Sequence, residues 1–294
     1  MTSGLSAAVD GFRLAFDRFG SPGAQSVVLL HGWPGHRHDY RLVAPDLARV
    51  ADVVVPDLRG FGESDKHLAD PQQFYSAAAQ ARSVVGLIDE LGLDRVVLGG
   101  YDVGSRIAQA LARQHPERIV GLVVSPPFPG VGDRVLGEGP QREFWYQAFH
   151  QLPVADALID GKPDAVRAYL RHFWEHWSGP QLRVSDDEFE RLAADYESPG
   201  AFSASIAWYR AGAGTVEHSL REEAPTPAER VTVPTRALWP KNDPLFPPDW
   251  AEGLDGYFTD VTVHFVDRAG HFTPLECAAE FAGLVRGFLG DARR

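Results

Sequence analysis

The chain has 294 residues, of which 44% are hydrophobic and 23% charged, so it can bury a large core and is not a disordered polypeptide. Its 28 basic and 40 acidic side chains give a formal net charge of −12. This argues against a nucleic-acid partner, which requires a basic surface, and disfavours an anionic membrane surface as a partner.

The single cysteine and the first residues of the chain bear on its location. Cys277 has no second cysteine with which to form an internal disulfide, which favours a reducing compartment. The first residues contain no basic segment followed by an apolar run, and no stretch is long and apolar enough to span a membrane. We therefore expect a cytoplasmic protein. Its oligomeric state is left open between a monomer and a homo-oligomer.

Short apolar runs alternate with amphipathic stretches along most of the chain. The runs are rich in Val and Leu and do not alternate with polar residues, which is typical of parallel strands buried on both faces. The predicted strands are 26–31, 52–56, 95–100, 119–125, 235–239 and 261–266. The predicted helices are 73–91, 103–115 and 275–289. This order predicts an α/β fold with a mostly parallel, doubly wound sheet and helices on both faces.

The alternation stops at residues 133–223, which are rich in aromatic side chains and lack Val-rich runs. Segments containing Pro and Gly lead into and out of this region. We therefore predict an inserted helical cap over 133–223. Residues 1–132 and 224–294 would form the core domain.

A turn between a predicted strand and a predicted helix carries a carboxylate. The sequence Gly100-Tyr101-Asp102-Val103-Gly104 places small residues on both sides of Asp102, as a nucleophile on a sharp strand-to-helix turn requires. The start of the following helix favours a negative charge there. The alternatives are an ordinary helix-capping aspartate and a dinucleotide-binding loop, although the glycine spacing of such a loop is not met.

Three further residues fit a catalytic site built around Asp102. Trp33, in the sequence HGWPG directly after a predicted strand, can offer its backbone N–H together with that of Val103 as an oxyanion hole. Asp243 and His271 each follow later strands, so the chain order is nucleophile, acid and histidine. The carboxyl ends of parallel strands lie at one edge of a sheet, where all these residues are expected to meet. Asp133 is the rival candidate for the acid.

The chain resembles the α/β-hydrolase-fold epoxide hydrolases, in particular the bacterial soluble ones, from about residue 10 to residue 289. The resemblance rests on HGWPG, VVPDLRGFGESDK, the turn at Asp102, FWYQAFHQLPVADALI, RHFWEHWS, AWYRA and AGHF. It implies that Tyr146 and Tyr209 of the cap hold and protonate the oxygen of a small-molecule epoxide. Asp102 would attack the epoxide carbon, and His271 with Asp243 would activate the water that releases a vicinal diol. No metal or organic cofactor is implied.

The resemblance also implies a substrate pocket, and this chain departs from the family at positions near the nucleophile. The expected pocket residues are His31, Pro34, Tyr101, Trp145, Phe149 and His150. Many relatives have His before and Trp after the nucleophile, whereas this chain has Tyr101 and Val103. Arg106 lies four residues after Asp102, a position at which fluoroacetate dehalogenases resemble this chain. These enzymes also carry an arginine directly after the nucleophile, where this chain has Val103.

Two other functions and one metal pattern compete with this interpretation. A haloalkane or haloacid dehalogenase would use the same aspartate ester but expel a halide, which needs no proton from a tyrosine. A non-catalytic binding protein of the same fold would not need Asp243 and His271. His172, Glu175 and His176 match an inverted zinc-peptidase pattern, but they lie in the predicted cap within a segment that resembles a structural part of the family, so no metal is expected.

Overall fold

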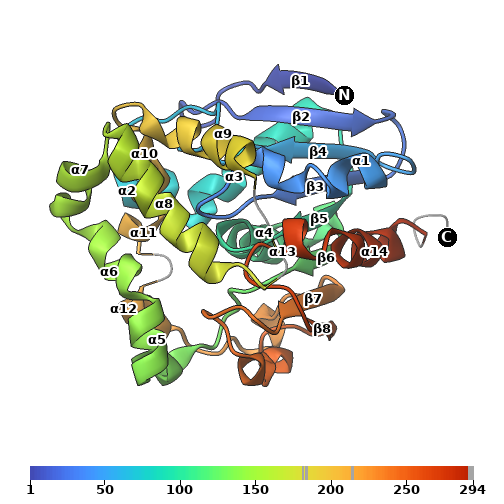
Figure 1. Ribbon diagram of the computed structural model, residues 1–294. Coiled ribbons are helices and arrows are strands. Elements are labelled where there is room, and N and C mark those ends of the chain that lie inside the picture. The colour runs from blue at the N-terminus through green and yellow to red at the C-terminus, as the bar shows by residue number, and fades with distance from the viewer. Residues whose placement is uncertain (181, 183–184, 213–214, 291–294) are drawn as a thin grey trace.

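One eight-stranded sheet runs through the computed structural model, which describes residues 1–180, 182, 185–212 and 215–290 (Figure 1). Its strands are β1 (Thr2–Leu5), β2 (Ala15–Gly20), β3 (Ser26–Leu30), β4 (Asp52–Pro56), β5 (Val96–Gly100), β6 (Ile119–Val124), β7 (Thr235–Pro240) and β8 (Val261–Val266). Their order across the sheet is β1-β2-β4-β3-β5-β6-β7-β8. β1 and β2 are antiparallel to their neighbours, and the other six strands are parallel.

The six predicted strands are present with ends within one residue of those expected, and the α/β fold class is confirmed. β3, β4 and β5 are buried along their whole length, as their continuous apolar runs predict. β8 differs, because it lies at the edge of the sheet and is only partly buried. The antiparallel pair β1 and β2 was not predicted, since neither strand carries a long apolar run.

Six α-helices of the described chain lie outside the segment between β6 and β7. They are α1 (Val43–Leu47), α2 (Pro71–Tyr75), α3 (Ala77–Glu90), α4 (Val103–Gln114), α13 (Thr273–Glu276) and α14 (Ala278–Leu289). Of these, α1, α4 and α14 pack directly on strands. α3 packs with α4 and α1 packs with α14, so the two pairs cover opposite faces (Figure 1). The predicted helix 73–91 is divided at Ser76, whose side chain accepts a hydrogen bond from the Ala79 N–H and begins α3.

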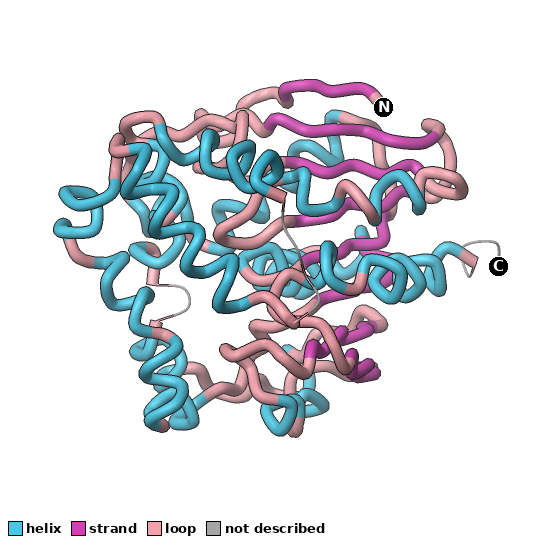
Figure 2. Tube along the Cα trace, viewed as in Figure 1, coloured by secondary structure: helices cyan, strands magenta, loops and turns pink. Residues whose placement is uncertain are grey.

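The described part of the segment between β6 and β7 contains helices and no strand. These helices are α5 (Glu138–Glu143), α6 (Trp145–Gln151), α7 (Pro153–Ile159), α8 (Pro163–Trp177), α9 (Asp186–Glu197), α10 (Ala201–Ser205), α11 (Ala207–Arg210) and α12 (Val216–Arg221). In Figure 2 they form a helical layer on the left, beside the strands. The exact limits of a cap at 133 and 223 stay a prediction.

Short 3-10 helices complete the described chain, and all lie in connections. They are Arg37–Tyr40, Pro116–Arg118, Gly132–Leu136, Pro227–Glu229, Pro248–Ala251 and Leu254–Gly256. None of the helices in the described ranges is long and apolar enough to cross a bilayer.

Candidate active site

Asp102 occupies the turn between β5 and α4 in a backbone conformation that side chains rarely adopt. Its φ is 49° and its ψ is −123°. A Cβ added to Gly100 would lie 2.5 Å from the Gly104 carbonyl oxygen, and one added to Gly104 would lie 2.1 Å from the Leu30 carbonyl oxygen. The small residues on both sides of Asp102 are therefore required by the close packing of this turn against β3.

The loop after β3 brings a backbone donor to the Asp102 carboxylate. The Trp33 N–H donates a hydrogen bond of 2.6 Å to Asp102 Oδ1. The approach is possible because residue 32 is glycine, where an added Cβ would lie 2.5 Å from the Asp102 Cβ. The α9 helix fixes the same loop, since the Tyr196 hydroxyl accepts from the Gly35 N–H and donates to the Gly35 carbonyl. Val103, the other predicted donor, is the first residue of α4.

His271 lies between two carboxylates beneath the helical layer. Its Nδ1 is 2.9 Å from Asp243 Oδ2, and its Nε2 is 3.3 Å from Asp102 Oδ2. The second contact lacks hydrogen-bond geometry, so Nε2 makes no hydrogen bond. The other oxygen of Asp243 accepts the Leu245 N–H at 2.9 Å, which holds that carboxylate toward the ring. Asp133, the rival acid, is exposed in a 3-10 helix instead.

The charges around His271 control its protonation. Burial lowers the pKa of the imidazole, but the carboxylates of Asp243 and Asp102 outweigh burial and raise it to about 10. The ring is therefore an imidazolium at neutral pH as long as both carboxylates are ionised.

Glu276, which the sequence analysis missed, fixes the loop that carries His271. Its Oε2 accepts the N–H of Gly270 at 2.8 Å and of Gly179 at 2.7 Å, and its Oε1 accepts the N–H of Phe272 at 3.0 Å. The residues on both sides of His271 and the end of the α8 segment thus share one carboxylate. The only signal in the sequence for these hydrogen bonds is a Glu five residues after the predicted catalytic His.

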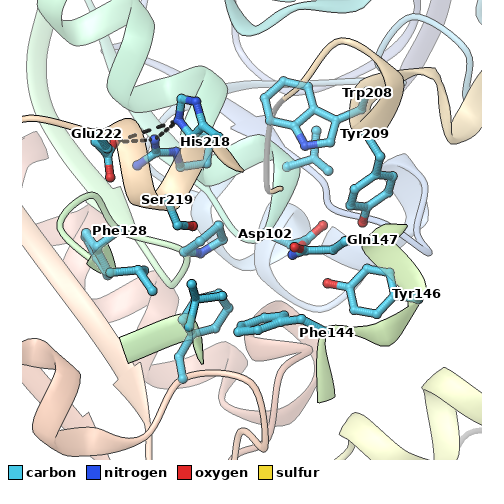
Figure 3. A pocket seen from close by; sticks show the side chains of 16 residues that line it. Asp102, Phe128, Phe144, Tyr146, Gln147, Trp208, Tyr209, His218, Ser219 and Glu222 are labelled. Carbon is cyan, nitrogen blue, oxygen red and sulfur yellow. Dashed lines mark hydrogen bonds and ion pairs between the residues drawn. The ribbon is translucent and has the colours of Figure 1, made fainter. Parts of the chain in front are cut away.

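Tyr146 of α6 and Tyr209 of α11 come together above Asp102. Their ring centroids are 5.6 Å apart, and Figure 3 shows both hydroxyls directed toward the region of the Asp102 carboxylate. Burial raises the pKa of both phenols well above its ordinary value, and the negative charge of Asp102 raises it further. Both side chains are therefore neutral hydrogen-bond donors at physiological pH.

One cavity contains Asp102 and both tyrosines (Figure 3). Its empty space, including the open mouth, is about 620 Å³. Apart from these three residues, it is lined by Val103, Arg106, Pro127, Phe128, Val131, Val135, Phe144, Gln147, Trp208, His218, Ser219, Glu222 and Phe246.

None of the six expected pocket residues lines this cavity. His31 and Tyr101 are buried beneath the turn, where the Tyr101 hydroxyl donates to Asp39 at 2.5 Å and His31 Nε2 accepts the Leu58 N–H at 3.0 Å. Each of these two residues directly follows a buried strand, β3 or β5, and its side chain is buried in the core. Pro34 is also buried.

The three expected pocket residues from α6 do not line the cavity either. Trp145 is 42% exposed and lies with Phe149 in an apolar surface groove. His150 is buried behind Tyr209, with its Nε2 2.9 Å from the Tyr169 hydroxyl. Gln147, the residue after Tyr146, lines the cavity instead.

The described ranges contain no group of three His, Cys, Asp or Glu side chains arranged to hold a metal ion. In the zinc-like pattern, His176 Nε2 is within hydrogen-bond distance of Glu143 Oε2, at 2.6 Å.

Comparisons with known proteins agree with this geometry. Residues 25–277 match the family model described as the alpha/beta hydrolase fold. The chain belongs to this family.

Among individual relatives, a soluble epoxide hydrolase from Corynebacterium sp. (strain C12) is 28% identical, with 92% of this chain and 91% of the relative aligned. A fluoroacetate dehalogenase from Burkholderia sp. is 31% identical over 66% of this chain and 64% of the relative. The solved structure of the epoxide hydrolase CorEH without ligand superposes with a TM-score of 0.82, at 25% identity and 99% coverage of both chains. This α/β-hydrolase is therefore similar to enzymes of two activities that differ in the bond they break.

Proposed function

We propose that this α/β-hydrolase is an epoxide hydrolase that converts a small-molecule epoxide and water to a vicinal diol. The observation that carries the proposal is a single cavity with a carboxylate on a strained turn and two neutral phenols opposite it. An epoxide needs both, since its carbon is attacked while its oxygen takes up a proton. The similarity to epoxide hydrolases over more than nine-tenths of the chain supports the same conclusion.

In the first half-reaction, Asp102 Oδ2 attacks an epoxide carbon and the C–O bond of the ring breaks. Asp102 Oδ1, which accepts the Trp33 N–H, becomes the carbonyl oxygen of an alkyl ester. The released alkoxide takes a proton from Tyr146 or Tyr209. An alkoxide is a stronger base than a phenolate even when burial has raised the pKa of the phenol.

Formation of the ester changes the charge around His271. One of the two carboxylates that raise the pKa of His271 becomes neutral, so the pKa falls and the imidazolium can release its proton toward the phenolate. The neutral ring then takes a proton from water, and the hydroxide attacks the Asp102 carbonyl carbon. The Trp33 and Val103 N–H groups stabilise the resulting oxyanion. The diol leaves when the bond between this carbon and the alkyl oxygen breaks, and the departing oxygen receives the proton held by His271. Asp102, left as a carboxylic acid, then gives its proton to His271, which restores the carboxylate and the imidazolium.

A dehalogenase is the second candidate, because the Burkholderia relative is one and Arg106 lies near the nucleophile. Two features favour an epoxide over a halogenated compound as the substrate. A halide leaves without a proton, so it has no use for two phenols. The Arg106 guanidinium is also paired with Glu222 at 2.8 Å, which disfavours a second carboxylate beside it.

The two candidates are separated by product analysis of one purified preparation. Incubation with styrene oxide is expected to yield 1-phenylethane-1,2-diol, while 1-chlorobutane and fluoroacetate release no halide above the background without enzyme. Halide release without diol formation from any member of a panel of aliphatic and aryl epoxides would overturn the proposal.

Tyr146→Phe and Tyr209→Phe each remove one phenol but keep the ring packing. Each variant is expected to lower kcat/KM for the epoxide by roughly 10- to 100-fold, and the double variant by 10³-fold or more, because the alkoxide loses its proton donors. Steady-state diol formation measures this. Tyr75→Phe is the control, since its hydroxyl donates to the His67 carbonyl away from the cavity. Full activity in the double variant would contradict the role of the phenols.

Glu276→Gln removes the charge from the carboxylate that fixes the His271 loop. One amide oxygen cannot serve three N–H groups, so we expect a loss of roughly 1–3 kcal/mol in the free energy of unfolding. We also expect the ester to be hydrolysed roughly tenfold more slowly while its formation is unchanged, because only hydrolysis uses His271. Single-turnover kinetics separate the two steps. Glu280→Gln, an exposed position on α14, is the matched control, and equal slowing of both steps would contradict this role.

A further inference from the structure

The catalytic cavity has a second polar end, which the reaction above does not use. Arg106 lies one turn along α4 from Asp102, about 6 Å further along the helix axis, and both side chains line the same cavity. His218 and Ser219 of α12, with Glu222 just after it, line this end as well. Figure 3 shows His218, Ser219 and Glu222 on the side of the cavity away from Tyr146 and Tyr209.

The charges at this end cancel each other. Arg106 Nη2 is 2.8 Å from Glu222 Oε1, and Glu222 Oε2 accepts the Gly130 N–H at 2.8 Å. Burial opposes the charge of Glu222, but Arg106 and this N–H hold the pKa of the carboxyl below its ordinary value. Burial and the nearby guanidinium lower the pKa of His218, which is therefore neutral at pH 7.

Donor groups nevertheless remain available. The hydrogen bonds of Arg106 within the described chain all use Nη2, and the Nη1 and Nε groups of a guanidinium carry three further N–H donors. The Ser219 hydroxyl also lines the cavity. The same cavity is also lined by apolar side chains, among them Phe128, Val131 and Phe144.

We infer that the enzyme selects epoxides that carry, across an apolar spacer, an uncharged hydrogen-bond acceptor such as a carbonyl or ether oxygen, which Arg106 binds. This inference rests on the proposed function. The spacer lies against the aromatic wall, and the acceptor oxygen receives an N–H from the guanidinium. A carboxylate in the same place is repelled by Glu222, and an alkyl group leaves the donors without a partner.

Three styrene oxides with different para substituents test this inference: acetyl as a neutral acceptor, isopropyl as an apolar group of similar shape, and carboxylate as an anion. kcat/KM is measured from diol formation for each. The substituents also differ in intrinsic reactivity, so the deciding number is the change in a ratio between wild type and variant. Arg106→Met is expected to lower the acetyl-to-isopropyl ratio roughly tenfold. Arg113→Met, exposed on the same helix, is the matched control and leaves the ratio unchanged.

Glu222→Gln supplies an independent arm that keeps Arg106. Removal of the negative charge is expected to raise the carboxylate-to-acetyl ratio by roughly tenfold or more. This variant decides the question even if Arg106→Met fails to fold, and thermal unfolding identifies that case. An unchanged carboxylate-to-acetyl ratio in a folded Glu222→Gln, or an unchanged acetyl-to-isopropyl ratio in a folded Arg106→Met, overturns the inference. Absence of diol from all three epoxides and from unsubstituted styrene oxide overturns the proposed function instead.

Discussion

Asparagine in place of Asp102 is expected to abolish covalent capture of the substrate and to lower diol formation by roughly 10⁴-fold or more. The amide is nearly the same size as the carboxylate but is not a nucleophile. Asparagine also tolerates the positive φ of 49° at this turn better than most residues, so the fold is expected to survive. Intact-protein mass spectrometry after mixing with epoxide measures capture, and steady-state assays measure diol.

The design separates loss of chemistry from loss of fold. Thermal unfolding of Asp102→Asn should stay close to that of the wild type. Because the amide can hydrolyse slowly back to a carboxylate, the mass of the protein is checked immediately before each assay. A covalent adduct, or turnover above one per cent of wild type in protein that is still fully amidated, would remove Asp102 from the mechanism.

Glutamine in place of His271 is expected to leave ester formation intact but to slow ester hydrolysis by roughly 10³-fold or more, so that alkyl-enzyme accumulates. Attack by Asp102 needs no base, whereas the attacking water does. A rapid-quench experiment should give one equivalent of adduct per active site, and peptide mapping should place it on Asp102. An equally modified Asp102→Asn/His271→Gln double variant would show that the adduct forms elsewhere.

The raised pKa of His271 makes the two steps respond differently to pH in the wild type. In free enzyme the interactions of the ring with Asp243 and Asp102 raise its pKa to about 10. In the ester only Asp243 remains, so the pKa is lower and the fraction of neutral base rises earlier as pH rises. Single-turnover hydrolysis is therefore expected to increase with pH to a plateau reached below pH 10, while ester formation stays flat from pH 6 to 9. A hydrolysis rate that falls with rising pH would contradict a basic role for His271.

The meeting of the three proposed catalytic residues was predictable because sheet topology decides where strand ends lie. Asp102, Asp243 and His271 each follow a parallel strand, and such strands end at the same edge regardless of the connections between them. Trp33 follows the same logic after β3. Tyr146 and Tyr209 were expected only from the resemblance, since apolar periodicity in short helices does not identify which ring faces a cavity.

The pocket was not predictable in this way, because closeness in sequence to a motif is not closeness in space. Tyr101 precedes the nucleophile but points beneath the turn to Asp39, and Trp145 precedes Tyr146 but lies on the outer side of α6. The wall of the cavity at Asp102 includes Val131 and Val135, which lie in a segment without a recognisable motif. Glu276 accepts hydrogen bonds from three backbone N–H groups. Every residue except proline has such a group, so the sequence does not indicate which ones Glu276 binds.

The origin of the apolar wall has a consequence for how this enzyme can change. Part of the apolar wall belongs to the connection that follows β6, namely Phe128, Val131 and Val135. The turn at Asp102 is separate from this connection and packs closely against β3 at Gly104. Substitutions in that connection can reshape the space offered to a substrate without disturbing the packing of the reactive groups. We therefore expect new selectivities, in nature or in a laboratory library, to arise most readily at positions 131 and 135. Positions 32, 100 and 104 do not tolerate a larger side chain.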